Sequence, residues 1–188
     1  MTMTTEASPV PVSGRPMLAL IIREARNTDC DALSALAFRA KAVWGYDDRF
    51  MQACRAELSV SPEDLATADL CHGVGEVDGV VVGFHALRRL SASEWDLDAL
   101  FVAPEHLGCG VGSRLLLHAC DLARATGATR VWVQSDPHAV GFYEAMGARR
   151  VGVRVSASIA GRELPLLCLD LATGGRVARP GACGVDAG

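Results

Sequence analysis

Lysine is almost absent from this chain of 188 residues, because all but one of its 18 basic residues are arginine and Lys41 is the exception. Acidic residues number 22, so the formal net charge is −4. A chain without excess positive charge does not attract nucleic acid or an anionic membrane surface, and we expect neither as a partner. The preference for arginine by itself indicates no particular chemistry.

Long hydrophobic runs are missing as well. The longest near the N-terminus, Met17 to Ile22, stops at Arg23 and falls far short of the roughly 18 residues that span a bilayer. Residues 1–16 also lack the basic segment and the following apolar segment of a cleaved secretory signal. These absences predict a soluble protein of the cytoplasm.

Neither the cysteines nor the histidines have the spacing of a metal site. The seven cysteines form an odd set without a CxxC pair, which is not the pattern of a disulfide framework or a zinc knuckle. The five histidines are scattered, although His106 and His138 flank the candidate site described below. We therefore expect reduced, mostly buried cysteines and no metal cofactor.

Half of the residues are hydrophobic, which is enough to form the core of one domain. Residues 1–16 and 173–188 are rich in small and turn-forming residues without periodicity, so we predict a flexible tail at each end. The predicted folded domain is therefore 17–172.

Hydrophobic spacing in this domain changes from helical to strand-like and back. Thr28 and Asp31 are spaced like a capping box and predict a helix that runs towards Trp44. Asp78-Gly79 is the signal of a two-residue hairpin turn between two strands. The other predicted elements are a strand at 19–25, helices at 48–58 and from Ser61, strands at 70–77, 80–87 and 95–102, a helix at about 110–126, a strand at 130–134, a helix at 139–146 and strands at 149–156 and 164–171. This order predicts an antiparallel meander within a mixed α/β (α+β) fold that has helices on both faces of the sheet.

A glycine-rich loop joins the predicted strand ending at Val102 to the long helix. Gly108, Gly110 and Gly112 allow the backbone to curl so that several N–H groups face one point, where the helix N-terminus adds a partial positive charge. This favours binding of a phosphate or pyrophosphate. The sequence is neither GxxxxGK[ST] nor GxGxxG, which excludes a P-loop and a dinucleotide-binding loop. The alternative is that the glycines serve helix packing only.

Two motifs in sequence order resemble the GNAT superfamily of acetyl-CoA-dependent N-acetyltransferases. They are the segment from Leu100 to Gly112 and, about thirty residues later, the segment from Phe142 to Gly147. The resemblance covers about 21–171 and implies a mainly antiparallel sheet of about six or seven strands, with acetyl-CoA as co-substrate. The cofactor-binding residues that it implies are Leu100, Phe101, Val102, Leu107, Gly108, Cys109, Gly110, Val111, Gly112, Ser113, Asp136 and Phe142.

One position departs from the family's loop pattern. The family has Arg or Gln where this chain has Leu107, so pyrophosphate binding would depend on backbone N–H groups, with Arg114 as a further candidate. The resemblance also implies that the strand ending at Val102 splays from its neighbour and pairs its backbone with the pantetheine arm. Asp136 stands where many relatives have Asn.

Two catalytic tasks follow from the implied reaction. Attack of an amine on a thioester expels a thiolate, which a phenol can protonate, and the resemblance puts Tyr143 beside the sulfur. An alkyl ammonium must first lose a proton, and Asp96 and Asp98 alternate with Trp95 and Leu97 on one face of a strand. Asp96 lies at the same sequence distance from the glycine loop as the catalytic base of some relatives, so it is the favoured base. Asp98 is the second candidate. The alternatives are that Tyr143 only packs in the core, and that Asp96 and Asp98 only form a solvated or ion-paired face of the strand.

The segment between the first two predicted helices forms a wall of the acceptor pocket in this family. Trp44, Tyr46 and Asp47 lie there, and aromatic rings beside carboxylates suit a cationic amine. Arg162 or Glu163, between the last two strands, could reach the same pocket. We therefore predict acetyl transfer by direct attack to a primary amine of a small cationic molecule. A non-catalytic acyl-CoA sensor or interaction module, an acceptor amine on a protein, and a homodimer stay open.

Overall fold

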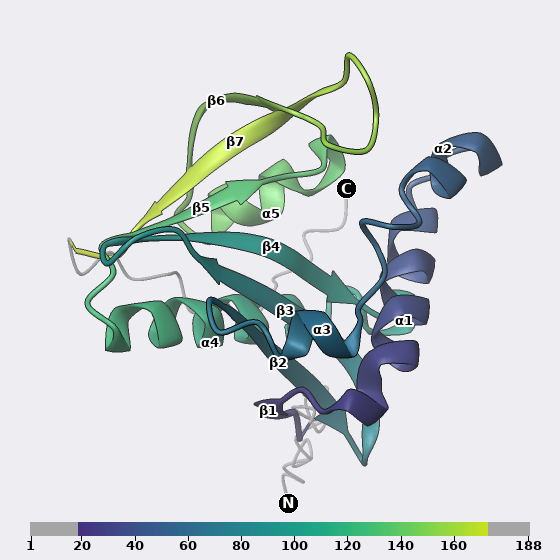
Figure 1. The fold of residues 1–188 in the computed structure, drawn as a ribbon, viewed down its shortest axis with the longest axis horizontal. Helices are drawn as coiled ribbons and strands as arrows, with labels where there is room; N and C mark the ends of the chain where they lie inside the picture. Colours follow the sequence, from purple (N-terminus) through teal and green to yellow (C-terminus); the bar gives the residue numbers. More distant parts are fainter. Residues whose placement is uncertain (1–18, 173–188) are drawn as a thin grey trace, which may run out of the picture.

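Seven strands form one sheet in the order β1-β2-β3-β4-β5-β7-β6 in the computed structural model, which describes residues 19–172 (Figure 1). The segments predicted as tails, 1–16 and 173–188, lie outside the described residues. The strands are β1 Ile21–Glu24, β2 Leu70–Val77, β3 Val80–Arg89, β4 Glu94–Val102, β5 Arg130–Gln134, β6 Arg149–Val155 and β7 Glu163–Asp170. All neighbouring strands are antiparallel except β4 and β5, so the predicted mixed, mainly antiparallel sheet is confirmed.

The helices lie on both faces of this sheet, as the sequence predicts. They are α1 Cys30–Ala42, α2 Asp48–Ala53, α3 Pro62–Leu65, α4 Val111–Ala125 and α5 Val140–Ala145, with the 3-10 turns η1 Asn27–Asp29, η2 Pro104–His106 and η3 Pro137–Ala139. Helix α4 packs on β2, β3 and β4, whereas α1 packs on the opposite face of β3 and β4 (Figure 1). The chain therefore forms a three-layer arrangement of helix, sheet and helix.

Of two local predictions, the hairpin turn is right and the capping box is wrong. The hairpin turn is confirmed, because Asp78 and Gly79 have φ of 51° and 77°, the left-handed values that a type I′ turn requires. The predicted capping box at Thr28 and Asp31 is wrong. The carboxylate that caps this turn is that of Asp29, which accepts a hydrogen bond from the backbone N–H of Arg26 at 2.7 Å. Asp29 is also held by Arg23 at 2.7 Å, which lowers the pKa of this carboxyl. The turn η1 therefore precedes α1.

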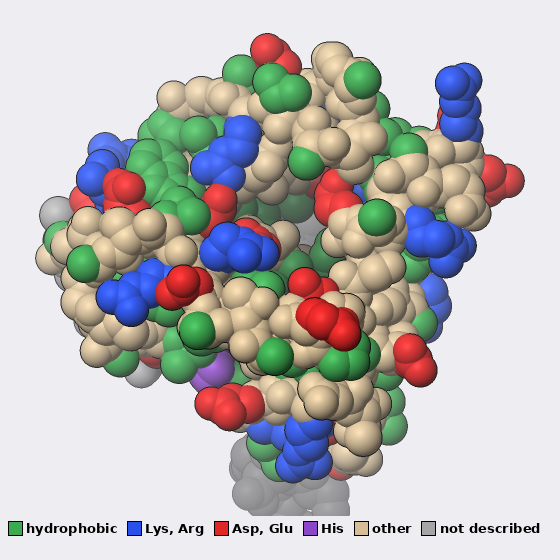
Figure 2. Space-filling model, in the orientation of Figure 1, with side chains coloured by type: hydrophobic (Ala, Val, Ile, Leu, Met, Phe, Trp, Pro, Cys, Tyr) green, Lys and Arg blue, Asp and Glu red, His purple; other side chains and the backbone are tan. Residues whose placement is uncertain are grey.

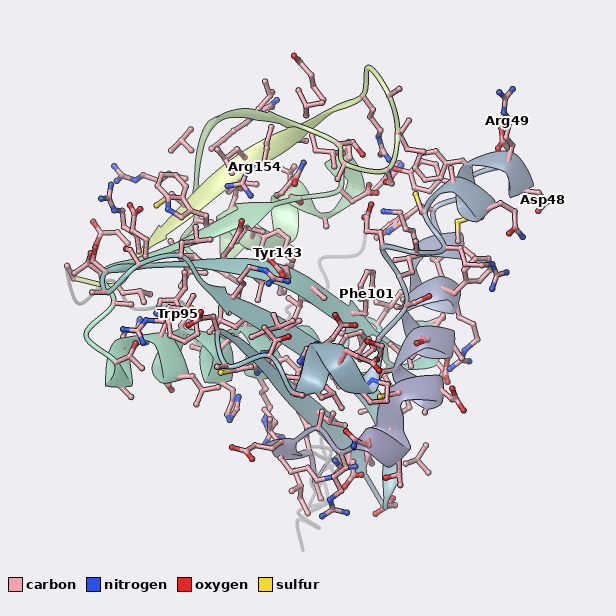
Figure 3. The ribbon with its side chains drawn as sticks, in the orientation of Figure 1. Asp48, Arg49, Trp95, Phe101, Tyr143 and Arg154 are labelled. Carbon is pink, nitrogen blue, oxygen red and sulfur yellow. The ribbon has the colours of Figure 1, made fainter. Side chains whose placement is uncertain are left out.

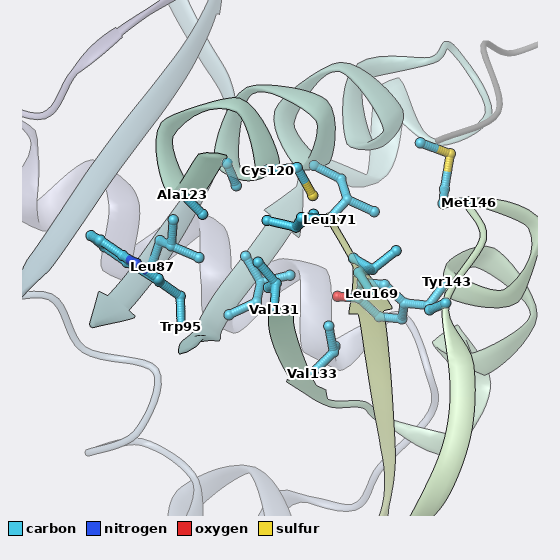
Figure 4. Close-up of a cluster of buried hydrophobic side chains, with 14 of the residues drawn as sticks. Leu87, Trp95, Cys120, Ala123, Val131, Val133, Tyr143, Met146, Leu169 and Leu171 are labelled. Carbon is cyan, nitrogen blue, oxygen red and sulfur yellow. The ribbon is translucent and has the colours of Figure 1, made fainter. Parts of the chain in front are cut away.

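The larger part of the core lies between α4 and the sheet. Leu116, Ala119 and Cys120 of α4 are completely buried against Val131 of β5 and Leu167 of β7, and Figure 4 shows part of this cluster. A second cluster, formed by α1 and α2 with the other face of the sheet, includes Leu33, Leu36 and Phe84. The six described cysteines are free. No helix within 19–172 is both long enough and apolar enough to cross a membrane.

Gly83 lies where β3 is tightly enclosed by β4 and α4. A Cβ atom there would lie 2.8 Å from the carbonyl oxygen of Phe101 and 2.9 Å from a methyl group of Leu115. Because a backbone oxygen cannot move without disturbing the strand pairing, we expect Gly83→Ala to lower the free energy of unfolding by about 1 to 3 kcal/mol in a urea titration. Gly152→Ala is the control, since a Cβ on this edge strand would have no atom within 4 Å. Equal losses in both variants would contradict the packing argument.

Candidate active site

The site begins where β4 and β5 separate. Their parallel pairing covers only Glu94 to Asp96 on β4 and Arg130 to Trp132 on β5. Beyond this point β4 continues to Val102, while β5 pairs only with β7. The backbone of the second half of β4 therefore has no partner on the β5 side, and the two strands diverge (Figure 1). The predicted splay is confirmed.

A β-bulge at Asp98 breaks the alternation of β4. Ala86 of β3 pairs with Ala99 and Leu87 pairs with Leu97, so Asp98 is the extra residue on β4. As a result Leu97 faces α4, whereas Ala99, two residues on, packs with α1 instead. The simple alternation that the sequence suggests for this strand therefore ends at Leu97.

The glycine loop leads directly into α4. Gly108 and Gly110 have φ of 72° and 79°, a left-handed conformation that residues with a Cβ atom rarely adopt. Gly110 is the N-cap of α4 and no side chain caps this helix, so its first N–H groups are available to an anion. Leu107 is 48% exposed. Arg114 donates instead to the carbonyl oxygen of Leu20 at 2.7 Å, which argues against a role on the phosphate.

A cavity of about 360 Å³ joins the loop to the opening between β4 and β5. Figure 2 shows the molecule hollowed near the centre of this face, with charged side chains around the opening. The predicted residues that line the cavity are Trp44, Asp98, Leu100, Phe101, Val102, Leu107, Gly108, Gly110, Gly112, Asp136, Phe142 and Tyr143. The predicted residues that do not line it are Tyr46, Asp47, Asp96, Cys109, Val111 and Ser113.

Several lining residues escaped the sequence analysis, notably Lys41, Glu57, Gln134 and Ser135. Gln134 and Ser135 could have been found, because they follow a predicted strand directly before Asp136. The one feature of the sequence that pointed to Lys41 is that it is the only lysine. Nothing in the sequence pointed to Glu57 as a residue of the site.

Tyr143 is 7% exposed and lines the cavity from α5. Figure 3 shows it and Phe101 in the central part of the molecule, near the opening. Burial raises the pKa of Tyr143 well above its usual range, so the phenol stays protonated at neutral pH. No residue within 19–172 forms a hydrogen bond with its hydroxyl group, which is thus available to a molecule in the cavity.

The two candidate bases differ in their position. Asp98 lines the cavity and accepts from Arg88 at 2.6 Å, and partial burial nevertheless raises the pKa of this carboxyl. Asp96 accepts from Arg154 of β6 at 2.5 Å and is absent from the cavity wall. Only Asp98 of the two lines the cavity, so the geometry favours Asp98 as the proton acceptor.

A smaller cavity of about 210 Å³ adjoins the first on the α1 side of the sheet. The two share Glu57, Asp98, Ala99 and Phe101, so two carboxylates lie at their junction. The side chain of Glu57 is exposed and accepts a hydrogen bond from Ser158. His72 also lines the smaller cavity, and burial lowers its pKa, so this histidine stays neutral at physiological pH.

Asp136 connects three segments that surround the main cavity. It accepts from the hydroxyl of Tyr46 at 2.9 Å and from the backbone N–H of His138 at 3.1 Å. Lys41 and Arg162 lie 3.7 Å and 3.6 Å from the same carboxylate, and Arg162 also donates to Tyr46 at 2.7 Å. This Asp136 network ties α1 and the α1–α2 loop to the loops after β5 and β6.

The remaining predicted acceptor residues have structural partners. Trp44 stacks on His138 with the ring centroids 5.0 Å apart. Asp47 caps α2 by accepting from the N–H of Phe50 at 2.8 Å, and Asp48 extends from α2 away from the centre of the molecule (Figure 3). Of the predicted carboxylates Asp47, Asp96 and Asp98, only Asp98 lines the cavity, which also contains Glu57 and Asp136.

Comparisons with known proteins agree with this geometry. A family model described as the acetyltransferase (GNAT) family matches residues 38–148, which include β4, the glycine loop and α5. Peptidyl-lysine N-acetyltransferase YjaB of Salmonella typhimurium is 34% identical over 149 residues, which cover 79% of this chain and 95% of that protein. Streptothricin acetyltransferase of Streptomyces lavendulae is 36% identical over 136 residues, covering 60% of this chain and 70% of that protein.

A solved structure has the same fold. PaiA N-acetyltransferase of Thermoplasma acidophilum, crystallised in complex with coenzyme A, matches with a TM-score of 0.66 at 15% identity. The match covers 81% of this chain and 99% of that one. The order and pairing of the strands are thus those of a fold already seen with coenzyme A.

Proposed function

The chain belongs to the acetyltransferase (GNAT) family and is an acyltransferase, and from this premise we propose that it moves the acetyl group of acetyl-CoA to a primary alkyl amine on a cationic acceptor. One observation carries the proposal. A single cavity joins an uncapped helix N-terminus behind Gly108 and Gly110 to the free hydroxyl of Tyr143. Membership of a family of acyltransferases supports an enzyme over a non-catalytic acyl-CoA sensor.

The chain's own groups divide the binding of acetyl-CoA between them. The first N–H groups of α4, together with the loop at Gly108 and Gly110, hold the pyrophosphate. The edge of β4 from Ala99 to Val102 that has no partner on the β5 side lies alongside the pantetheine arm, since an extended amide chain can pair with a strand edge. Leu107 adds only apolar contact, so affinity depends on the backbone.

In the proposed reaction the residues act in a fixed order. Asp98 takes a proton from the acceptor ammonium, directly or through water, because an ammonium has no lone pair. A backbone N–H of β4 stabilises the oxyanion that forms as the amine attacks the thioester carbonyl. Tyr143 donates its phenolic proton to the departing thiolate as the carbon–sulfur bond breaks, and it regains a proton from the attacking nitrogen, which loses one as it becomes the amide. The amine attacks directly, and the chain itself is not acylated in this cycle.

The acceptor is the finer part of the proposal. The carboxylates of Asp98 and Glu57 at the junction of the two cavities suit an alkyl ammonium through charge pairing. The side chain of a peptidyl lysine is the first candidate, supported by the likeness to YjaB over nearly all of that protein. A small-molecule amine is the second, because the adjoining cavity of about 210 Å³ has the size of a small ligand group and the streptothricin enzyme is also similar.

The test measures release of the CoA thiol with a panel of acceptors. The panel contains lysine peptides, peptides with a free N-terminal amine only, aminoglycosides, streptothricin and simple diamines. We expect the highest kcat/KM with alkyl amines that carry positive charge, and acetylated product by mass spectrometry. Acetyl-CoA binding in a calorimeter without thiol release on any member would reject the proposed reaction.

The assignment of the base makes a separate prediction. Asp98→Asn should lower kcat/KM for the amine about 10²-fold or more, and the loss should shrink as the pH rises and the free amine becomes abundant. The comparison variant is Asp96→Asn, which breaks the pair with Arg154 and should cost much less activity. Acetyl-CoA affinity should stay near the parent value in both. A larger loss in Asp96→Asn would return the base to Asp96.

A further inference from the structure

Lys41 is the only lysine of the chain, and it lies in the proposed acyl-transfer cavity. Arginine stands at every other basic position. The residue is 9% exposed at the end of α1, and it shares the cavity with Tyr143 and with Phe101 and Val102 of β4. The one primary amine among the chain's side chains therefore belongs to a residue that lines the cavity proposed to contain the thioester.

We propose that Lys41 is an internal acceptor, so that the enzyme acetylates its own Lys41 when acetyl-CoA is bound and no acceptor is present. This rests on the proposed function, because it requires acetyl-CoA in the cavity. The acetylated chain would be a second state of the enzyme.

The chemical step is balanced by groups that the cavity contains. Asp136, 3.7 Å from Nζ, takes one ammonium proton and passes it to solvent. The free amine attacks the thioester carbonyl, a carbon–nitrogen bond forms and the carbon–sulfur bond breaks. A second proton of the nitrogen replaces the one that Tyr143 gives to the CoA thiolate, and the third remains on the amide. The products are N-acetyl-Lys41, free CoA and one proton.

The surroundings of Lys41 can tolerate the loss of its charge. Arg162 lies 3.6 Å from the Asp136 carboxylate and donates to Tyr46, so Asp136 keeps a cationic partner after Lys41 is acetylated. Nζ lies 6.0 Å and 5.8 Å from the ring centroids of Tyr46 and Phe50, and these aromatic rings suit a neutral acetamide. Acetylation removes an ion pair and two cation–π contacts, which weakens the Asp136 network.

The experiment uses the full chain, first shown by intact mass to carry no acetyl group. It is incubated with acetyl-CoA that carries a carbon-13 label in its acetyl group, without an acceptor. We expect one labelled acetyl group per chain, mapped by peptide sequencing to Lys41, and a rate per chain that does not change with protein concentration. Lys41→Arg should take up no label on any side chain. A rate that rises with protein concentration would overturn the internal transfer.

Chemical acetylation is separated from enzymatic transfer by two comparisons. The heat-unfolded chain should label Lys41 at least about 10²-fold more slowly, because it lacks the bound thioester and the catalytic groups. The variant Arg39→Lys adds a second lysine on the same helix, at a side chain that is 55% exposed beside Glu105. Label confined to Lys41 supports the inference, and equal label at positions 39 and 41 overturns it.

The failure of this inference differs from failure of the proposed function. If calorimetry detects acetyl-CoA binding, the amine panel is acetylated and Lys41 stays unlabelled, self-acetylation is wrong and the proposed function stands. If neither binding nor thiol release occurs, the proposed function fails and the self-acetylation with it.

Discussion

Replacing Tyr143 with phenylalanine will lower kcat by about 10² to 10⁴, the usual contribution of a positioned general acid, with little change in the Kd for acetyl-CoA. The substitution removes one oxygen atom and keeps the ring that packs against Phe142, with centroids 5.0 Å apart. CoA thiol release gives kcat, and calorimetry gives the Kd. Because the hydroxyl has no hydrogen-bond partner within residues 19–172, the free energy of unfolding should hardly change.

The reason for the large effect is the position of the hydroxyl, which lies in the cavity that would contain the thioester and has no competing hydrogen-bond partner among the described residues. Burial raises the pKa of Tyr143, so the phenol is protonated at the pH of the reaction and can donate its proton as the thiolate leaves. The effect should be smaller with acyl donors whose leaving thiol is more acidic, since these need less protonation.

The chain's other tyrosine provides the matched control. Tyr46→Phe also removes a single hydroxyl, but one that donates to Asp136 and accepts from Arg162 at 2.7 Å. We expect it to loosen the Asp136 network, raise KM for the acceptor and leave kcat within about tenfold of the parent. Unchanged turnover in Tyr143→Phe, or an equal loss of kcat in both variants, would remove Tyr143 from the mechanism.

The sequence predicted those parts of the fold that depend on local chemistry. The Asp78-Gly79 turn, the glycine loop and the change of hydrophobic period each follow from a few neighbouring residues, and the structure confirms them. Tyr143, Phe101 and Val102, which two motifs of adjacent residues indicated, line the cavity, while their roles toward acetyl-CoA stay predictions.

The parts that the sequence did not predict arise from contacts between distant segments. Tyr46 and Asp136 are 90 residues apart, and Tyr46 and Arg162 are 116 apart, so no local pattern could pair them. The bulge at Asp98 follows from the register of β4 against β3, which alternation within β4 alone does not reveal. Asp98 lines the cavity and Asp96 does not, because Asp96 still pairs with Trp132 of β5 while Asp98 lies beyond the point where β4 and β5 separate.

A second large effect concerns stability in acid and comes from His85, on the face of β3 covered by α4. This side chain is completely buried, and its Nε2 lies 2.9 Å from Nδ1 of His118. Its Nδ1 has no partner among the described residues. The ring fills the space above Gly73, where a Cβ atom would lie 2.3 Å from Nε2. Burial, together with repulsion from His118 and His72, lowers the pKa of His85 to about 3.

The direction of the pH effect follows from this lowered pKa. In the unfolded chain the imidazole titrates near 6.5, so between pH 6.5 and about 3 the unfolded state binds a proton that the folded state refuses. The stabilisation is complete above pH 6.5 and is lost as the pH falls, by up to about 1.4 kcal/mol per pH unit. His72 and His118, whose pKa values burial also lowers, act in the same direction.

Urea titrations at constant ionic strength from pH 7.5 to 4.5 will therefore show a loss of about 2 to 3 kcal/mol in the free energy of unfolding from His85 alone. Asp29, with its lowered pKa, contributes only at the acid end of this window, because its carboxyl in the unfolded chain begins to bind a proton only as the pH approaches the ordinary value of 3.8. His85→Leu should flatten the slope with pH, whereas His138→Gln, at an exposed position, should leave it unchanged. The slope is the readout, so a constant shift in stability from repacking does not obscure it. An equally steep slope in His85→Leu would show that the acid sensitivity comes from another group.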